Sequence, residues 1–209
     1  MIKLKINNIK EENYNTKTFF LEKPENFSFI PGQHVELKIP KKDEIKPFTL
    51  SSIPQDNFIS LTIKNVSENT EKIFELKEGD FLEINGPFGE KLKFNQDKNK
   101  LLYFAAGSGI TPFISHFRFI KNEKLKKEAI LFYSNKTFED IIFFKELKSF
   151  DFLKTIFILT REKKEGFYYG YLTKEIITNT IKNKIDIYKI YVCGTEKFEK
   201  SVIELLESI

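Results

Sequence analysis

Two short segments of this 209-residue chain combine residue types that suit cofactor chemistry. Residues 46–52 read Lys-Pro-Phe-Thr-Leu-Ser-Ser, which offers a cation, an aromatic face and hydroxyl groups to a flat, phosphorylated heteroaromatic molecule. Residues 107–112 read Gly-Ser-Gly-Ile-Thr-Pro after an apolar run, and glycines there remove side chains where a dinucleotide must approach the backbone. Two such segments in one small chain predict that one bound molecule reacts with the other.

The composition and charge exclude several classes of protein. A formal net charge of +4 is too small for a nucleic-acid-binding protein, and no dense run of Lys and Arg with interleaved aromatic residues occurs. Cys193 is the one cysteine, which leaves no disulfide framework, no cysteine-rich metal site and no iron–sulfur cluster on this chain. With no signal-peptide pattern and no apolar run near ~18 residues, we expect a cytoplasmic protein without a membrane span.

The first ninety-odd residues have the pattern of an antiparallel β-barrel, in which many short strands alternate with turn signals. A helical pattern with a plausible cap interrupts them at residues 70–76. The strands are expected over residues 2–9, 16–21, 35–39, 58–66 and 81–84.

From about residue 98 the pattern changes to strands that alternate with helices, which predicts a parallel α/β sheet of about four strands. In such sheets, ligands bind beyond the carboxyl ends of the strands. We therefore expect one domain over residues 1–97 and a second over residues 98–209. The expected strands cover 101–106, 129–133, 155–160 and 187–193, and the expected helices cover 112–122, 138–147, 173–181 and 196–207.

The order of these motifs resembles the ferredoxin–NADP reductase family of FAD- and NAD(P)-binding flavoprotein oxidoreductases. Residues 46–49 resemble its Arg-x-Tyr-Ser/Thr motif, residues 86–89 resemble its Gly-Pro-aromatic-Gly turn, and Cys193-Gly194 resembles its Cys-Gly pair. The resemblance implies a Greek-key barrel that holds the flavin, followed by a Rossmann-like domain that binds NAD(P).

The resemblance also implies which residues contact the flavin. Lys46 would neutralise a flavin phosphate, Phe48 would pack on the isoalloxazine, and Thr49 would hydrogen-bond near N5 as a catalytic group. The start of the helix at Thr70 would bind a pyrophosphate through free backbone N–H groups, which favours FAD over FMN; an ordinary capped helix is the alternative. The chain has Lys and Phe where the family has Arg and Tyr, and Lys lacks a bidentate fork. The expected flavin contacts are Lys46, Pro47, Phe48, Thr49, Leu50, Ser51, Ile63, Lys64, Asn69 and Thr70.

For the dinucleotide, the resemblance places the glycine turn under the nicotinamide ribose and pyrophosphate, and Cys193 near nicotinamide C4. Cations such as Arg161 favour NADPH over NADH, although surface lysines alone could reflect solubility. The expected dinucleotide contacts are Gly107, Ser108, Gly109, Thr111, Pro112, Ser134, Asn135, Lys136, Thr160, Arg161, Tyr171, Cys193, Gly194 and Thr195.

These features predict an NAD(P)H-dependent flavin oxidoreductase in which a hydride passes from nicotinamide C4 to flavin N5. The electrons would then pass to a separate acceptor such as flavodoxin, ferredoxin or an oxygenase component, and the basic balance weakly favours an acidic protein. Two alternatives remain open: an electron-transfer subunit of a larger complex, and a non-catalytic dinucleotide-binding module that has lost its flavin.

Overall fold

The computed structural model describes residues 1–181 and 185–209, and it divides into two compact units. The first unit comprises Met1–Phe94 and Thr111–Asn122, and the second comprises residues 95–110 and 123–209. Helix α2 (Thr111–Asn122) therefore groups with the first unit, whereas the sequence pattern placed it in the second domain. A single domain boundary near residue 97 stays a proposal.

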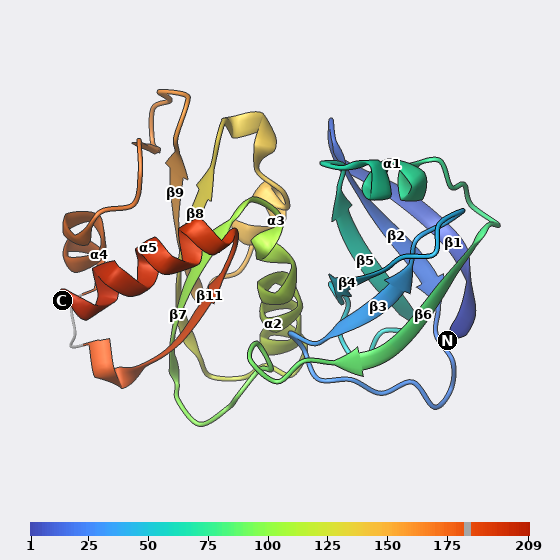
Figure 1. Ribbon diagram of the computed structural model, residues 1–209. Helices are drawn as coiled ribbons and strands as arrows, with labels where there is room; N and C mark the ends of the chain where they lie inside the picture. The colour runs from blue at the N-terminus through green and yellow to red at the C-terminus, as the bar shows by residue number, and fades with distance from the viewer. Residues whose placement is uncertain (182–184) are drawn as a thin grey trace. The chain divides into compact units, whose positions relative to one another are not determined.

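The first unit is an antiparallel barrel (Figure 1). Its six strands follow the order β4-β3-β6-β1-β2-β5, and a bridge between Leu50 and Leu61 joins the two outer strands. Because β6 pairs with both β1 and β3, the barrel is not a simple meander. The elements are β1 (Ile2–Asn13), β2 (Thr16–Glu22), β3 (His34–Lys38), β4 (Ile45–Thr49), β5 (Phe58–Lys64), β6 (Phe81–Phe88) and α1 (Glu68–Phe74).

Both faces of β2 and β5 are buried, although only one face is apolar. Phe19 and Leu61 point into the barrel core, where burial of each large apolar side chain stabilises the fold by about 1.5–3 kcal/mol. Side chains alternate along a strand, so Thr18, Ser60 and Thr62 occupy the opposite face, and they too are buried. Buried hydroxyl groups require hydrogen-bond partners, and the three residues meet this requirement among themselves and their neighbours.

Two features of the barrel differ from the pattern expected from the sequence. Strand β6 continues through Gly86-Pro87-Phe88, where a turn was expected. The pairing of β6 with β3 shifts register at these residues, so the strand does not end there. Gly86 adopts a φ of +135° there, a conformation that suits only glycine. Helix α1 begins at Glu68, earlier than expected, because Ser67 is its capping residue.

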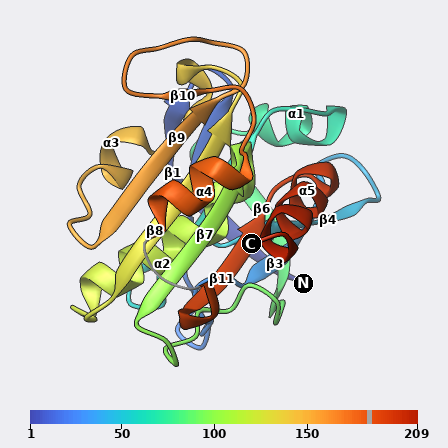
Figure 2. The ribbon, with the colours of Figure 1, turned by 90° about the vertical axis from the view of Figure 1, so that its left-hand side faces the viewer.

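The second unit is a parallel sheet, with α4 and α5 covering one face (Figure 2). The strand order is β10-β9-β8-β7-β11, and Phe104, Phe132 and Ile158 pack with Ile177 of α4 and Val202 of α5. The strands are β7 (Lys100–Ala106), β8 (Glu128–Asn135), β9 (Leu153–Leu159), β10 (Tyr168–Tyr169) and β11 (Tyr188–Cys193). The helices are η1 (Gly107–Ile110), η2 (Phe138–Asp140), α3 (Phe144–Leu147), α4 (Lys174–Thr180), η3 (Ile185–Ile187) and α5 (Glu196–Glu207).

Two expectations for this sheet were wrong. The sheet has five strands, because the two-residue strand β10 pairs with β9; so short a strand carries no readable periodicity. The helix expected over 138–147 is split into η2 and α3, since Phe143 takes a left-handed φ of +61° that no α-helix can contain. The parallel α/β architecture itself is confirmed.

Candidate functional site

The glycine turn after β7 lies against the end of β11. These strands are neighbours in the sheet, with Cys193 opposite Ala105. A Cβ placed on Gly109 would lie 2.2 Å from the Cys193 carbonyl oxygen, so only glycine fits there. A Cβ on Gly107 would meet no atom within 4 Å, but this residue has a φ of +52°. The turn thus needs glycine twice, once for a close backbone contact and once for its conformation, and its Gly107 side faces open space.

A tyrosine that the sequence analysis missed holds this turn in place. The Tyr133 hydroxyl on β8 donates a hydrogen bond to the Gly107 carbonyl at 3.0 Å. Burial raises the pKa of Tyr133 far above its usual value, so the hydroxyl remains a neutral donor. An apolar strand with one tyrosine gives no sequence signal for this role, because the contact depends on which strands are neighbours.

The segments that follow β8 and β9 run together beyond the strand ends. The backbone N–H of Thr160 donates to the Asn135 carbonyl at 2.9 Å, and that of Arg161 donates to the Lys136 carbonyl at 2.9 Å. The side chains of Lys136 and Arg161 are exposed. Four residues that the sequence assigned to the nucleotide from separate motifs are therefore held side by side.

A pocket of about 250 Å³ opens next to these segments. Ser134, Thr160, Tyr171 and Thr195, all expected contacts, line it, and Tyr171 is 79% exposed. Its remaining lining residues were not expected from the sequence; they are Leu172, Lys197, Phe198, Ser201 and Val202. Hydroxyl groups, two aromatic rings and one ammonium group surround the space, and none of these described lining residues carries a carboxylate. Such a lining fits a nucleoside that bears a phosphate.

In the barrel unit, strand β4 presents a cation, a ring and a hydroxyl in order along one strand. Lys46 is exposed, while Phe48 and Thr49 are half-buried and Phe48 packs on the barrel core. The Lys46 ammonium lies 3.3 Å from Glu44 Oε2, and that same oxygen accepts a hydrogen bond from Asn69 Nδ2 at 2.8 Å. These two partners, the Asn69 amide first, hold the pKa of Glu44 below its usual value. Glu44, which the sequence analysis overlooked, thus joins two expected flavin contacts.

The start of α1 is already capped by its own side chains. Thr70 Oγ1 accepts hydrogen bonds from the backbone N–H groups of Val66 and Ser67, each at 2.9 Å, and Ser67 Oγ accepts from Thr70 N at 3.4 Å. Glu68 and Glu71 lie in the first turn of the helix. A pyrophosphate at this position would share it with two carboxylates, which oppose an anion.

The residues after Thr49 make hydrogen bonds both with the barrel and with helix α2. Leu50 N donates to the barrel residue Gln33, while the carbonyls of Ser51 and Ser52 accept hydrogen bonds from helix α2. The α2 donors are Arg118 Nη1, at 2.7 Å from Ser51 O, and Ser115 Oγ, at 2.6 Å from Ser52 O. Neither donor was expected from the sequence, although polar residues on a helix whose first turns are buried are a usable signal.

The remaining expected contacts take the following positions. Ile63 points into the barrel core, so only its backbone can meet a ligand, and Lys64 is half-buried at the end of β5. Thr111 and Pro112 are buried at the start of α2. Pro47 and Ser108 are exposed, and Gly194 packs against Phe198 and Ala106, since a Cβ there would lie 2.6 Å from the Phe198 ring.

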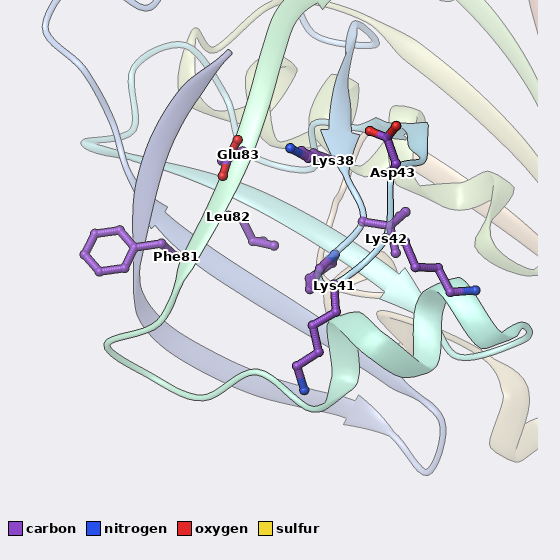
Figure 3. Close-up of a pocket in the computed structure, with 9 residues that line it drawn as sticks. Lys38, Lys41, Lys42, Asp43, Phe81, Leu82 and Glu83 are labelled. Carbon is purple, nitrogen blue, oxygen red and sulfur yellow. The ribbon is translucent and has the colours of Figure 1, made fainter.

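A second pocket, of about 410 Å³, surrounds the turn between β3 and β4 (Figure 3). It gathers Lys38, Lys41 and Lys42 with the carboxylates of Asp43 and Glu83. Lys42 also pairs with Glu68 at 2.8 Å, and Lys41 with Glu75 at 3.0 Å. None of the expected cofactor contacts lines this pocket, and its mixed charges are largely compensated, so we assign no cofactor to it.

Comparison with known proteins identifies the family. Residues 3–93 match the family model described as an oxidoreductase FAD-binding domain, and residues 104–204 match that of an oxidoreductase NAD-binding domain. A probable dihydroorotate dehydrogenase B (NAD(+)) electron transfer subunit from Methanocaldococcus jannaschii is 33% identical over 96% of this chain and 71% of its own length. NADH-cytochrome b5 reductase 2-A from Vanderwaltozyma polyspora is 30% identical over 94% of this chain and 72% of its own length.

A solved structure extends the comparison to the fold. The ferredoxin NADP+ reductase from Neisseria gonorrhoeae, with bound FAD and NADP, superposes with a TM-score of 0.82 at 19% identity, covering 99% of this chain and 90% of its own. Among the described residues, no helix is long and apolar enough to cross a membrane. The chain belongs to the ferredoxin reductase-like family of FAD- and NAD(P)-binding flavin oxidoreductases.

Proposed function

We propose that this chain transfers a hydride from NADPH to bound FAD and then delivers the electrons to a separate acceptor in the cytoplasm. The observation that carries the choice of NADPH is the pocket beside Thr160 and Tyr171. Its described lining contains Lys197 and no carboxylate, and Arg161 follows Thr160 directly. A carboxylate at this place would hydrogen-bond the ribose 2′-OH of NADH, whereas cations suit the 2′-phosphate of NADPH.

The chain's own groups bind and orient the two cofactors, and bound FAD supplies the redox chemistry. Lys46 would leave Glu44 to contact a flavin phosphate, and Thr49 would direct its hydroxyl toward flavin N5. The open side of Gly107 would admit the dinucleotide backbone, and Cys193 would guide the nicotinamide ring. Holding two reactants in contact geometry lowers a barrier by roughly 7–11 kcal/mol.

A second function, as a subunit of a larger electron-transfer complex, is favoured by one comparison. The Methanocaldococcus relative is named as an electron transfer subunit, and the match covers 96% of the present chain. In that case the acceptor would be a partner protein, and the net charge of +4 favours an acidic one. Size-exclusion chromatography and affinity capture from the native host would reveal a complex of fixed composition.

Reconstitution tests the proposed function. The purified chain is titrated with FAD and, separately, with FMN, and flavin fluorescence reports binding. We expect FAD to bind more tightly and the loaded chain to be reduced by NADPH at lower concentrations than by NADH. A chain that binds a nicotinamide coenzyme but neither flavin would instead be a dinucleotide-binding module. Tighter binding of NADH than NADPH would refute the coenzyme assignment alone.

A further inference from the structure

A continuous line of hydroxyl groups runs through the barrel unit to a carboxylate. Ser60 Oγ lies 2.8 Å from Ser51 Oγ, which lies 2.9 Å from Thr62 Oγ1, which in turn lies 2.8 Å from Thr18 Oγ1. Thr18 Oγ1 donates to Glu12 Oε1 at 2.8 Å. The four hydroxyl residues are all buried, and each distance is typical of a good O–H···O hydrogen bond.

The carboxylate at one end sets the direction of the hydrogen bonds that Thr18 and Thr62 donate. An ionised carboxylate only accepts, so the single hydroxyl proton of Thr18 must point to Glu12. Thr62 must then donate to Thr18, and the proton of Ser51 is shared between Thr62 and the Ser60 carbonyl oxygen, which lies 3.1 Å from Ser51 Oγ. Thr18 and Thr62 therefore point toward Glu12, and a proton passes outward from Ser51 when its hydroxyl points to Thr62 and not to the Ser60 carbonyl.

One end of the line lies in the segment assigned to the flavin, and the other end lies near the surface. Ser51 belongs to the segment assigned to the flavin and follows Thr49 by two residues. At the far end, the Glu12 side chain is only 6% exposed, but its second oxygen meets the Lys10 ammonium at 2.8 Å. The Lys10 side chain is 57% exposed, so this end of the line reaches water.

We propose that Ser51, Thr62, Thr18 and Glu12 form a proton exit path from the flavin site; this rests on the proposed function. Hydride transfer brings one hydrogen with two electrons to the flavin, and the acceptor removes only the electrons, which leaves one proton to be released per turnover. The proton enters at Ser51 as each O–H bond along the line breaks and the next forms. Glu12 becomes protonated and then gives the proton to water.

Sheet stabilisation is the alternative role for these hydroxyl groups, because Thr–Thr pairs across neighbouring strands stabilise a sheet by themselves. The branch at Ser60 separates the two roles. Ser60 is as deeply buried as Ser51 and donates to it, but it lies off the route from Ser51 to Glu12. A structural role predicts similar consequences for loss of any of these hydroxyls, whereas a relay predicts that only the residues on the route matter.

The experiment compares Thr62→Val, which keeps the shape but removes the central hydroxyl, with Ser60→Ala as the matched control. FAD-loaded protein is reduced with NADPH and reoxidised with ferricyanide while a pH-indicator dye follows the proton. We expect Thr62→Val to be reduced normally but to release its proton roughly ten-fold more slowly or worse, and Thr62→Ser to restore the rate. Ser60→Ala should behave as the unaltered protein does.

An infrared measurement gives a second readout that does not depend on rates. A carboxyl band should appear during reoxidation, be absent from Glu12→Gln and be delayed in Thr62→Val. Equal proton-release rates in Thr62→Val and Ser60→Ala would overturn the path. So would slowing that occurs only in His34→Gln, since His34 is the strand neighbour of Thr49. Failure to bind or reduce FAD would instead reject the proposed function.

Discussion

The two units of this molecule differ in how far their expected cofactor residues are engaged with the protein itself. In the barrel unit, Lys46 is paired with Glu44, and Thr70 and Ser67 form the capping box of helix α1. In the α/β unit, Gly107 borders open space, and Tyr171, which lines a pocket, is 79% exposed. A dinucleotide would thus enter open space beside Gly107 in the second unit, whereas a flavin phosphate would compete with Glu44 for Lys46.

The difference follows from how each unit builds its site. Parallel strands end at one edge of a sheet, and the turns beyond them offer backbone groups and space that glycine keeps open. The barrel site depends instead on charged side chains along β4 and α1, which find one another when no ligand is present. Dinucleotide binding should therefore depend mainly on shape, and flavin binding mainly on charge.

The largest effect is expected where shape is most restricted. Gly109→Ala would place a Cβ 2.2 Å from the Cys193 carbonyl oxygen, a backbone atom that cannot move aside. We expect kcat/KM for NADPH to fall by roughly 100-fold or more, which corresponds to about 2.7 kcal/mol. FAD affinity serves as the internal control, because the barrel segment 46–52 is unaltered. A proportional loss of flavin binding would contradict the separation of the two sites.

The next largest effect is expected at Arg161, the cation proposed to contact the 2′-phosphate of NADPH. Arg161→Ala should raise KM for NADPH by about ten-fold, because a charge-assisted contact to the 2′-phosphate is lost, and should change KM for NADH little. Lys163→Ala is the matched control, since Lys163 is an adjacent cation that lies over the Tyr169 ring. Equal changes in KM for both coenzymes would remove the basis for preferring NADPH.

Low pH should weaken the packing of helix α2 against the barrel. His116 is fully buried, its Nε2 lies 2.9 Å from the Leu92 carbonyl, and burial lowers its pKa from 6.5 to about 3. The unfolded chain then binds a proton that the folded chain does not, so stability is full above pH 6.5 and declines as the pH falls toward 3. The slope is about 1.4 kcal/mol per pH unit for a single group.

Hydrogen exchange of α2 amides between pH 7 and pH 5 would detect this decline. His116→Gln should flatten the pH dependence, even if it lowers stability at neutral pH, and His34→Gln controls for the loss of a histidine as such. An unchanged slope in His116→Gln would show that another group governs the acid response.

The smallest effect is expected where Glu44 and a flavin phosphate compete for Lys46. Glu44→Gln removes the carboxylate while keeping a side chain that Asn69 can still contact. We expect FAD affinity at low salt to rise by about two- to five-fold, because exposed ion pairs are weak and screened. The gain should shrink as salt is added. A fall in affinity would mean that Glu44 positions Lys46 for the phosphate and does not compete with it.

The sequence was sufficient for the contacts that are local and for the order of the elements. The glycine turn, the strand before it and the Cys193-Gly194 pair are contiguous motifs, and the structure brings Gly109 and Cys193 together as neighbours. The partners found only in the structure are remote in sequence. Glu44 meets Asn69 across 25 residues, and Tyr133 reaches Gly107 across 26, because pairing of that kind depends on which strands become neighbours.

The same reason explains the hydroxyl line. Its members come from β1, β2, β5 and the segment after β4. Taken singly, each is an ordinary polar residue with no sequence signal for this role. The alternation of apolar and polar residues in β5 predicts that its polar face is exposed to solvent. In the structure both faces of β5 are buried. Only the register between β2 and β5, with Thr18 opposite Thr62, brings the hydroxyls into one line.

Single-turnover reduction of the FAD-loaded chain tests the central claim most directly. Under anaerobic conditions, NADPH deuterated at nicotinamide C4 is mixed with the protein, and the visible flavin band is followed in time. We expect the band to bleach in a saturable phase, more slowly with the transferred deuterium than with hydrogen. Full FAD occupancy with no bleaching by either NADPH or NADH would contradict it.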